Sequence, residues 1–201
     1  MSTVIASVDR RSPAQLAGIK PGEQLLTING HEIIDVLDYR FYGYDADSHL
    51  TLREPNGAQR AVHIRKQEGQ DLGLNFDTYL MDEMRSCANH CIFCFVDQMP
   101  PGMRQTLYFK DDDARLSFLL GNYITLTNLT EREAQRIIDL HICPINVSVH
   151  TTDPQLHCTM LGNKNAGRSL EYIRAFCKAG IVMNGQIVIC PGWNDGDQLR
   201  R

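Results

Sequence analysis

Three cysteines within one short stretch constrain this chain more than any other feature of its sequence. Cys87, Cys91 and Cys94 are spaced four and three residues apart, so their thiolates can grip one metal site from one side of a loop. A set of three protein ligands leaves one coordination position open. The sequence therefore predicts a metal centre that can take a further, non-protein ligand.

Structural zinc and disulfides are the alternatives to an iron–sulfur site. Structural zinc usually has two separated Cys-x-x-Cys pairs, whereas this stretch has one pair and a single cysteine before it. A histidine as the fourth ligand would complete a zinc site, so structural zinc stays an alternative. A disulfide framework suits neither seven cysteines nor a chain of 201 residues. Because no secretory signal precedes these thiols, we expect a cytoplasmic location. Iron–sulfur ligation is the favoured interpretation.

The cysteine stretch resembles the cluster loop of the radical S-adenosylmethionine (radical SAM) superfamily. The match is Cys87-x-x-x-Cys91-x-Phe93-Cys94, with an aromatic residue just before the last cysteine. This resemblance implies that the thiolates hold a 4Fe-4S cluster whose fourth iron binds the amino and carboxylate groups of SAM. It also implies cleavage of SAM to a 5'-deoxyadenosyl radical that abstracts hydrogen from a substrate, with Phe93 near the adenine.

Residues 71–197 resemble a narrower group within that superfamily. Its members have an N-terminal PDZ-like domain, a radical SAM core and a C-terminal domain of unknown function (DUF512). The run from Ser12 to Gly30, Ser-Pro-Ala-x-x-Ala-Gly-Ile-x-Pro-Gly-x-x-Leu-x-x-Ile-Asn-Gly, closely resembles a PDZ domain. We therefore predict a PDZ-like domain over residues 1–77 and part of a radical SAM core over residues 78–201.

The N-terminal third has the local pattern of a small β-rich domain. Alternating apolar residues predict strands at 3–8, 24–28, 50–53 and 60–65. A Ser cap followed by Pro predicts a short helix at 12–19, and a second, amphipathic helix is expected at 34–44. Asn29-Gly30 is the strongest two-residue hairpin signal.

A second PDZ-like feature follows these strands. The run from Asp71 to Phe76 resembles the loop that binds a ligand's terminal carboxylate, placed as in the circularly permuted bacterial PDZ form. The resemblance implies that Leu72, Gly73 and Leu74 hold the C-terminal carboxylate of a protein or peptide tail. An equally weighted interpretation is a closing strand that docks the two domains.

From Tyr79 onward, strands and helices alternate, which is typical of a parallel α/β sheet or barrel. We expect an incomplete (β/α)6 barrel that is cut after its fourth strand, and we expect this 201-residue chain alone to be truncated and inactive. The predicted strands are 79–84, 122–128, 145–150 and 183–190, and the predicted helices are 115–120, 131–140 and 167–179. The run Asp111-Asp112-Asp113 is expected to be a solvated helix start rather than a magnesium site.

The resemblance also implies residues that contact SAM. The superfamily's Gly-Gly-Glu element, which binds the SAM amino group, is replaced by Thr127-Asn128-Leu129, so backbone carbonyls and the Asn128 amide are the expected substitutes. Ser148 and His150 on the third strand and Gln186 on the fourth occupy positions that contact ribose or the methionine carboxylate.

Charge and hydropathy exclude two classes of partner. The formal net charge of −4, without a basic stripe, argues against nucleic-acid binding, and no apolar run is long enough to span a bilayer. We expect an enzyme that binds a 4Fe-4S cluster and SAM, needs a reducing electron donor and acts on an unidentified substrate. The alternative is a non-enzymatic PDZ-type adaptor whose cysteine loop holds a structural metal or cluster.

Overall fold

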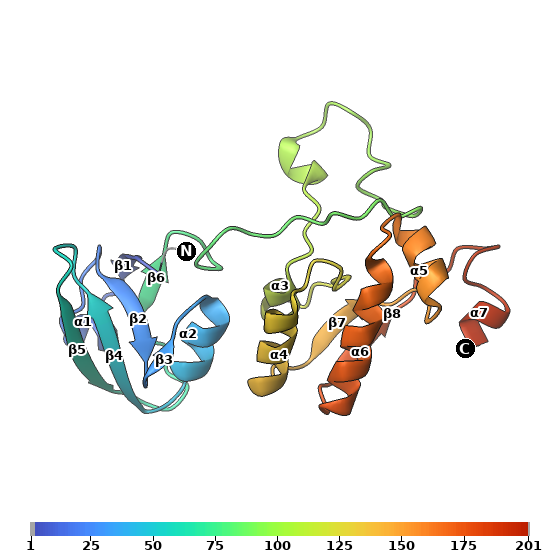
Figure 1. Ribbon diagram of the computed structural model, residues 1–201. Coiled ribbons are helices and arrows are strands. Elements are labelled where there is room, and N and C mark those ends of the chain that lie inside the picture. Colours follow the sequence, from blue (N-terminus) through green and yellow to red (C-terminus); the bar gives the residue numbers. More distant parts are fainter. Residues whose placement is uncertain (1–2, 201) are drawn as a thin grey trace. The chain divides into compact units, whose positions relative to one another are not determined.

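The computed structural model describes residues 3–200. The chain divides into two compact units, Met1–Glu83 and Met84–Arg201 (Figure 1). The predicted boundary after residue 77 lies slightly before this division. Each unit has its own secondary structure and its own core.

The first unit is β-rich, as predicted. Strands β3 (His31–Glu32), β2 (Gln24–Ile28), β4 (Asp47–Arg53) and β5 (Gln59–Arg65) form an antiparallel sheet in that order. Strands β1 (Ile5–Val8) and β6 (Leu74–Phe76) form a separate antiparallel pair. Helices α1 (Pro13–Leu16) and α2 (Val36–Tyr42) complete the unit.

Local sequence signals explain these elements. Asn29 and Gly30 adopt φ angles of 52° and 82°, the left-handed pair that a tight hairpin turn between β2 and β3 requires. The side chain of Ser12 accepts the Gln15 amide to cap α1, and that of Asp35 accepts the Leu37 amide to cap α2. The predicted hairpin and both predicted helices are confirmed.

The second unit mixes helices with a short parallel sheet. Strands β7 (Ile145–Ser148) and β8 (Met183–Gln186) pair in parallel, and Ile124 adds one isolated parallel bridge to Val147. The helices are α3 (Ala114–Leu120), α4 (Glu131–Asp139), α5 (Pro154–Leu161), α6 (Ser169–Lys178) and α7 (Asp197–Arg200), with 3-10 turns η1 (Gln105–Tyr108) and η2 (Ala166–Arg168).

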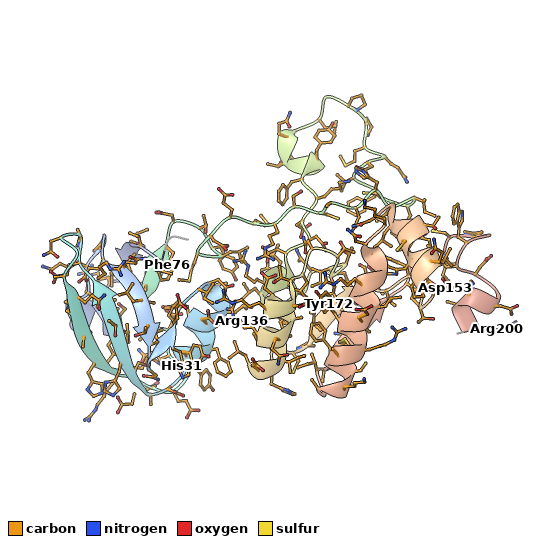
Figure 2. All side chains as sticks on the ribbon, in the orientation of Figure 1. His31, Phe76, Arg136, Asp153, Tyr172 and Arg200 are labelled. Carbon is orange, nitrogen blue, oxygen red and sulfur yellow. The ribbon has the colours of Figure 1, made fainter. Side chains whose placement is uncertain are left out.

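The apolar core of this unit lies between the parallel pair and two helices. Ile145 and Val147 of β7 are buried against Ala134 and Ile137 of α4 and against residues of α6. Tyr172 of α6, labelled in Figure 2, donates its hydroxyl hydrogen bond to the Leu129 carbonyl before α4. A capping box formed by Thr130 and Glu133 begins α4, and the predicted helix at 131–140 is confirmed.

Several predicted barrel strands differ from the structure. Residues 79–84 contain no strand, and residues 122–128 contribute only the bridge at Ile124, because Leu126 has a φ of 60° that breaks an extended chain. Strands β7 and β8 end at Ser148 and Gln186, before the predicted ends. Helix α5 was missed, although Asp153, Pro154 and Gly162 supply its cap, first residue and stop.

Within residues 3–200, no helix is long and apolar enough to cross a membrane.

Candidate cofactor site

The cysteine loop is held in place by backbone hydrogen bonds to two other segments. The amide of Cys87 donates to the Lys110 carbonyl at 2.6 Å. Further along, the amides of His90 and Ile92 donate to the carbonyls of Leu161 and Met160, both at 2.9 Å. Because the last carbonyls of a helix lack intrahelical partners, the end of α5 supplies a ready set of acceptors that fixes the loop.

Asn89, between the first two cysteines, is the polar anchor of the loop. Its side chain is 1% exposed and lies within hydrogen-bond distance of the hydroxyls of Thr125 and Thr127, at 3.0 and 2.9 Å. The amide of Asn163 donates to the Asn89 side-chain oxygen at 2.7 Å. One buried amide therefore joins the loop to residues 36 to 74 positions away.

Gly162, the residue that ends α5, lies directly against the loop. Its φ is 58°, and a Cβ atom built on it would overlap the carbonyl oxygen of His90. Any other residue at this position would push the loop away from the helix. The sequence signal for a helix stop is thus also a requirement of the loop's position.

The three cysteines are half-buried free thiols. Burial, followed by the charges of Cys87 and Cys94, raises the pKa of Cys91 to about 12. Burial likewise raises the pKa of Cys87. Without a cation the thiols of Cys87 and Cys91 are therefore protonated, and a bound metal would favour their thiolates.

Lys110 brings a positive charge to the loop. Its ammonium group donates to the Asn89 carbonyl at 3.0 Å and pairs with Asp97 at 2.8 Å. Its charge acts to lower the pKa of both Cys87 and Cys91. A cation held against the backbone of the loop suits a site whose ligands are anionic.

The three aspartates that follow Lys110 bind different partners. Asp111 accepts from Asn122, Asp112 from Thr125, and Asp113 from Arg115. The expected helix start is confirmed, because Asp113 caps α3, but the expectation of a solvated run is wrong, since Asp112 and Asp113 are buried. Burial raises the pKa of Asp112 to about 6.

Phe93 and His150, two of the predicted SAM-contacting residues, touch each other. Their rings meet edge to face with centroids 4.5 Å apart. His150 is buried, and its Nδ1 accepts the Val188 amide at 3.1 Å. Burial, with a smaller effect of His157, lowers the pKa of His150 to about 4, so the imidazole is neutral at neutral pH.

The other predicted SAM-contacting residues lie on nearby segments of the same unit. Thr127 is tied to the loop through Asn89, and Ser148 and Gln186 are register partners across β7 and β8. The amide nitrogen of Asn128 is buried without a hydrogen-bond partner. An unpartnered buried donor is costly to keep, so Asn128 has the free hydrogen-bonding capacity that a ligand oxygen would satisfy.

Sequence reasoning missed Asn89, Lys110 and Asp112 as residues of this site. Asn89 sits inside the cysteine motif, and the other two follow the long connection after it. Their positions were visible, but their partners are distant in sequence. Only the fold shows that these side chains converge on the loop.

The predicted carboxylate loop belongs to the first unit, where two of its three backbone amides already have acceptors. The Gly73 amide donates to the Asp71 carboxylate at 2.6 Å, and the Leu74 amide donates to the Tyr39 hydroxyl at 3.3 Å. Leu72 and Leu74 are buried. The Asp71 carboxylate thus already accepts from the Gly73 amide, the donor that a ligand carboxylate would use.

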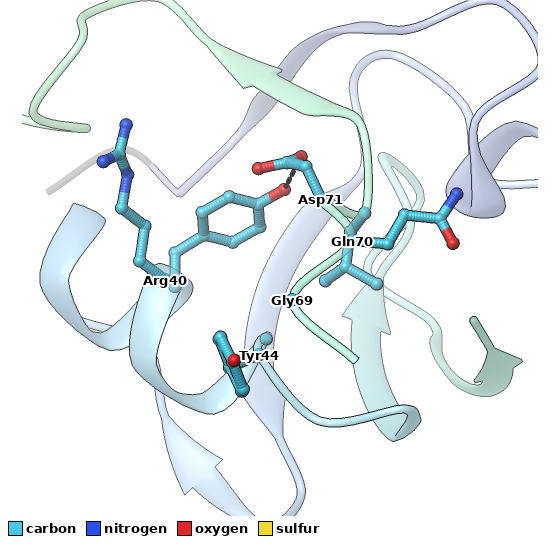
Figure 3. Close-up of a pocket in the computed structure, with 8 residues that line it drawn as sticks. Arg40, Tyr44, Gly69, Gln70 and Asp71 are labelled. Atoms are coloured by element: carbon cyan, nitrogen blue, oxygen red, sulfur yellow. Dashed lines mark hydrogen bonds between the residues drawn. The ribbon is translucent and has the colours of Figure 1, made fainter. Parts of the chain in front are cut away.

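A pocket of about 240 Å³ lies beside this loop (Figure 3). It is lined by residues of α2, of the turn that follows α2 and of the segment before β6, including Tyr39, Arg40, Tyr44, Gln70 and Asp71. The Tyr39 hydroxyl donates to Asp71 at 3.0 Å across it. The pocket therefore joins a cation, aromatic faces and a carboxylate.

Comparisons with known proteins agree with the two units. A family model for a PDZ domain matches residues 4–53, and one described as a radical SAM-like domain matches residues 66–201. The chain has no match among curated proteins. Since the second model spans more than half of the 201 residues, this chain belongs to the radical SAM-like domain family and carries a PDZ domain ahead of that domain.

Proposed function

We propose that the protein is a radical SAM enzyme in which Cys87, Cys91 and Cys94 hold a 4Fe-4S cluster. The observation that carries this proposal is the fixed loop, which presents three half-buried thiols around one buried Asn89 anchor. Three thiolates leave one iron of such a cluster open to SAM. The order of a PDZ domain followed by a radical SAM-like domain also supports membership of the narrower group with a C-terminal domain of unknown function.

When bound, the cluster and SAM would supply one-electron cleavage of SAM and hydrogen-atom abstraction from a substrate, with the electron coming from an external donor. The chain's own residues bind and orient. Asn89 and the carbonyls at the end of α5 keep the cysteine loop rigid, and Lys110 offsets negative charge at the sulfurs. Such preorganisation matters because a loosely held ligand set binds and positions its cofactor poorly.

The proposed SAM contacts follow from the same arrangement. Phe93 and His150 offer an aromatic wall beside the loop, and neutral His150 brings no charge to repel the sulfonium of SAM. The unpartnered Asn128 amide is a donor for a carboxylate or hydroxyl oxygen. Thr127, Ser148 and Gln186 add polar groups on adjacent segments.

The second candidate function is a PDZ-type adaptor that binds a peptide while the cysteine loop holds a structural metal. The pocket beside α2 favours it. In this function a peptide carboxylate would bind the amides of Leu72, Gly73 and Leu74, displacing the Asp71 carboxylate from the Gly73 amide and the Tyr39 hydroxyl from the Leu74 amide. The substrate of the enzyme and the ligand of the PDZ domain are independent questions.

Metal content separates the two functions. After anaerobic reconstitution with iron and sulfide, we expect roughly four irons per chain and a brown protein. Cys91→Ala should lose the iron, whereas Cys177→Ala, which changes an exposed cysteine of α6, should retain it. A colourless protein that binds zinc in place of iron would favour the adaptor.

A further inference from the structure

The outer face of the first unit's sheet holds a second group of metal-ligand side chains. Asp47, His49 and His63 are exposed, and each offers one ligand atom, all within 4.8 Å of one another. They lie in the unit that lacks the cysteine loop. The radical SAM assignment gives them no role.

The register of β4 and β5 explains why they meet. His49 stands directly opposite His63, and Asp47 lies two residues before His49 on β4. Side chains two residues apart on a strand share a face, and directly opposed residues have neighbouring Cβ atoms. The three side chains therefore project together from the solvent side, while Ser48 and Leu50 between and beside them are buried.

The side chains are also oriented alike. The two imidazole rings stack with centroids 4.3 Å apart and planes 4° from parallel. The Nε2 atoms of both rings face the same carboxylate oxygen: His63 hydrogen-bonds to Oδ1 of Asp47, and Nε2 of His49 lies 3.7 Å from it. Three ligand atoms of two chemical types thus converge on one small region.

We propose that Asp47, His49 and His63 form a binding site for a divalent transition-metal ion of the Zn²⁺, Ni²⁺ or Cu²⁺ class. Imidazole nitrogen and carboxylate oxygen are the ligands these ions take. At metal–ligand distances of about 2.1 Å, ligand atoms of one tetrahedral ion lie roughly 3.4 Å apart. The three ligand atoms lie within 4.8 Å of one another, so side-chain rotation would bring them to this separation, while β-sheet pairing already fixes the Cα positions.

The site would leave its remaining coordination positions to water or to a group from a partner. It differs from the cysteine loop in ligand softness, because it has no thiolate, and in that its three residues are exposed. The inference does not depend on the proposed radical SAM function.

Residue-resolved NMR of the full chain tests the site. Zn²⁺ would be added to protein with ¹⁵N-labelled histidine, and the Nε2 resonances followed, so that zinc at the cysteines is not mistaken for zinc at the sheet. We expect saturable, simultaneous shifts of the His49 and His63 Nε2 signals. His63→Ala should weaken zinc binding at His49 by at least about 10-fold, and Asp47→Asn should weaken it by less.

His31→Ala is the matched control. His31 is an exposed histidine of the same sheet (Figure 2), but its ring stacks on Tyr42 rather than on a second imidazole. This variant should bind zinc like the parent chain, and thermal melts should show that all the variants fold. Unchanged His49 and His63 resonances at excess zinc, or binding that survives His63→Ala, would overturn the proposal and leave an ordinary surface ion pair.

Discussion

The two units differ in how their buried polar groups are satisfied. In the first unit, Ser12 and Asp35 accept from amides two or three residues away, and the long-range exceptions include Glu23 and Tyr39, which bind Arg60 and Asp71. In the second unit, Asn89 binds side chains 36 to 74 residues away. The first unit is thus assembled from local caps around an apolar sheet core, whereas the second positions its site by long-range polar contacts.

This difference teaches where stability and function reside. An apolar core tolerates exchange of similar side chains, but a buried polar network is sensitive to the loss of any one member. We therefore expect core changes in the first unit to affect its own folding, and polar changes in the second unit to affect the cysteine loop.

Leu52→Ala should have the largest effect on stability. Leu52 is fully buried in β4, and removing a buried leucine side chain costs about 4 kcal/mol. Leu16→Ala, at a side chain that is 81% exposed, should change stability by less than about 0.5 kcal/mol. Hydrogen exchange resolved along the chain is the measurement. Equal loss of protection in residues 84–200 would contradict independent units.

Asn89→Ala should destabilise the second unit by roughly 3 kcal/mol, because it removes the buried side chain that Thr125, Thr127 and Asn163 all bind. Asn122→Ala removes an amide that binds the exposed Asp111 carboxylate in the same unit, and should cost below about 1 kcal/mol. Urea unfolding and iron content of the two variants provide the comparison. An Asn89→Ala protein with parental stability would show that Asn89 does not anchor the cysteine loop.

Asp112 gives the second unit a specific pH dependence. Its pKa is raised from 3.8 to about 6, chiefly by burial, so between these values the folded state holds a proton that the unfolded state has lost. Stability contributed by this group is therefore present at low pH and falls as the pH rises toward 6. The cost above pH 6 is roughly 3 kcal/mol.

The neutral variant Asp112→Asn lacks this titration. Its stability relative to the parent chain should rise between pH 4 and pH 7, as measured by urea unfolding at each pH. Asp111→Asn removes the exposed neighbouring carboxylate but leaves the buried one in place, and should show a smaller trend than Asp112→Asn. A parallel pH profile for Asp112→Asn and the parent would mean that Asp112 is ionised at no cost.

Gly162→Ala should have the smallest effect on stability and a clear effect on the loop. Gly192→Ala is the matched control, because both glycines have a positive φ but a Cβ at Gly192 meets nothing within 4 Å. Each loses about 1 kcal/mol from backbone strain, and only Gly162→Ala should lose roughly 1 kcal/mol more and reduce iron retention. Equal iron retention would show that the loop can move away from α5 without consequence.

Elements with short-range signals could be predicted from the sequence, and elements that depend on distant pairing could not. The Asn29-Gly30 turn and the Thr130 capping box carry their own geometry in adjacent residues. Residues 79–84 and 122–128 alternate like strands, yet a strand exists only where a neighbour pairs with it, and just Ile124 found one. The partial barrel therefore stays a prediction.

The site shows the same limit. The spacing of the three cysteines indicated the loop, whereas the contact between the Phe93 and His150 rings was not predicted. Asn89 gave no signal, since an asparagine between cysteines could equally face solvent. Its role follows from Thr127 and Asn163, which only the fold brings to it. The roles of the cysteines and of the SAM-contacting residues stay predictions.

The most direct test of the central claim is low-temperature electron paramagnetic resonance of the reconstituted, reduced protein with and without SAM. We expect a reduced-cluster signal that changes on adding SAM, is absent in Cys91→Ala and persists in Cys177→Ala. A cluster whose signal is indifferent to SAM, or a protein that binds no cluster, would contradict an open iron at Cys87, Cys91 and Cys94.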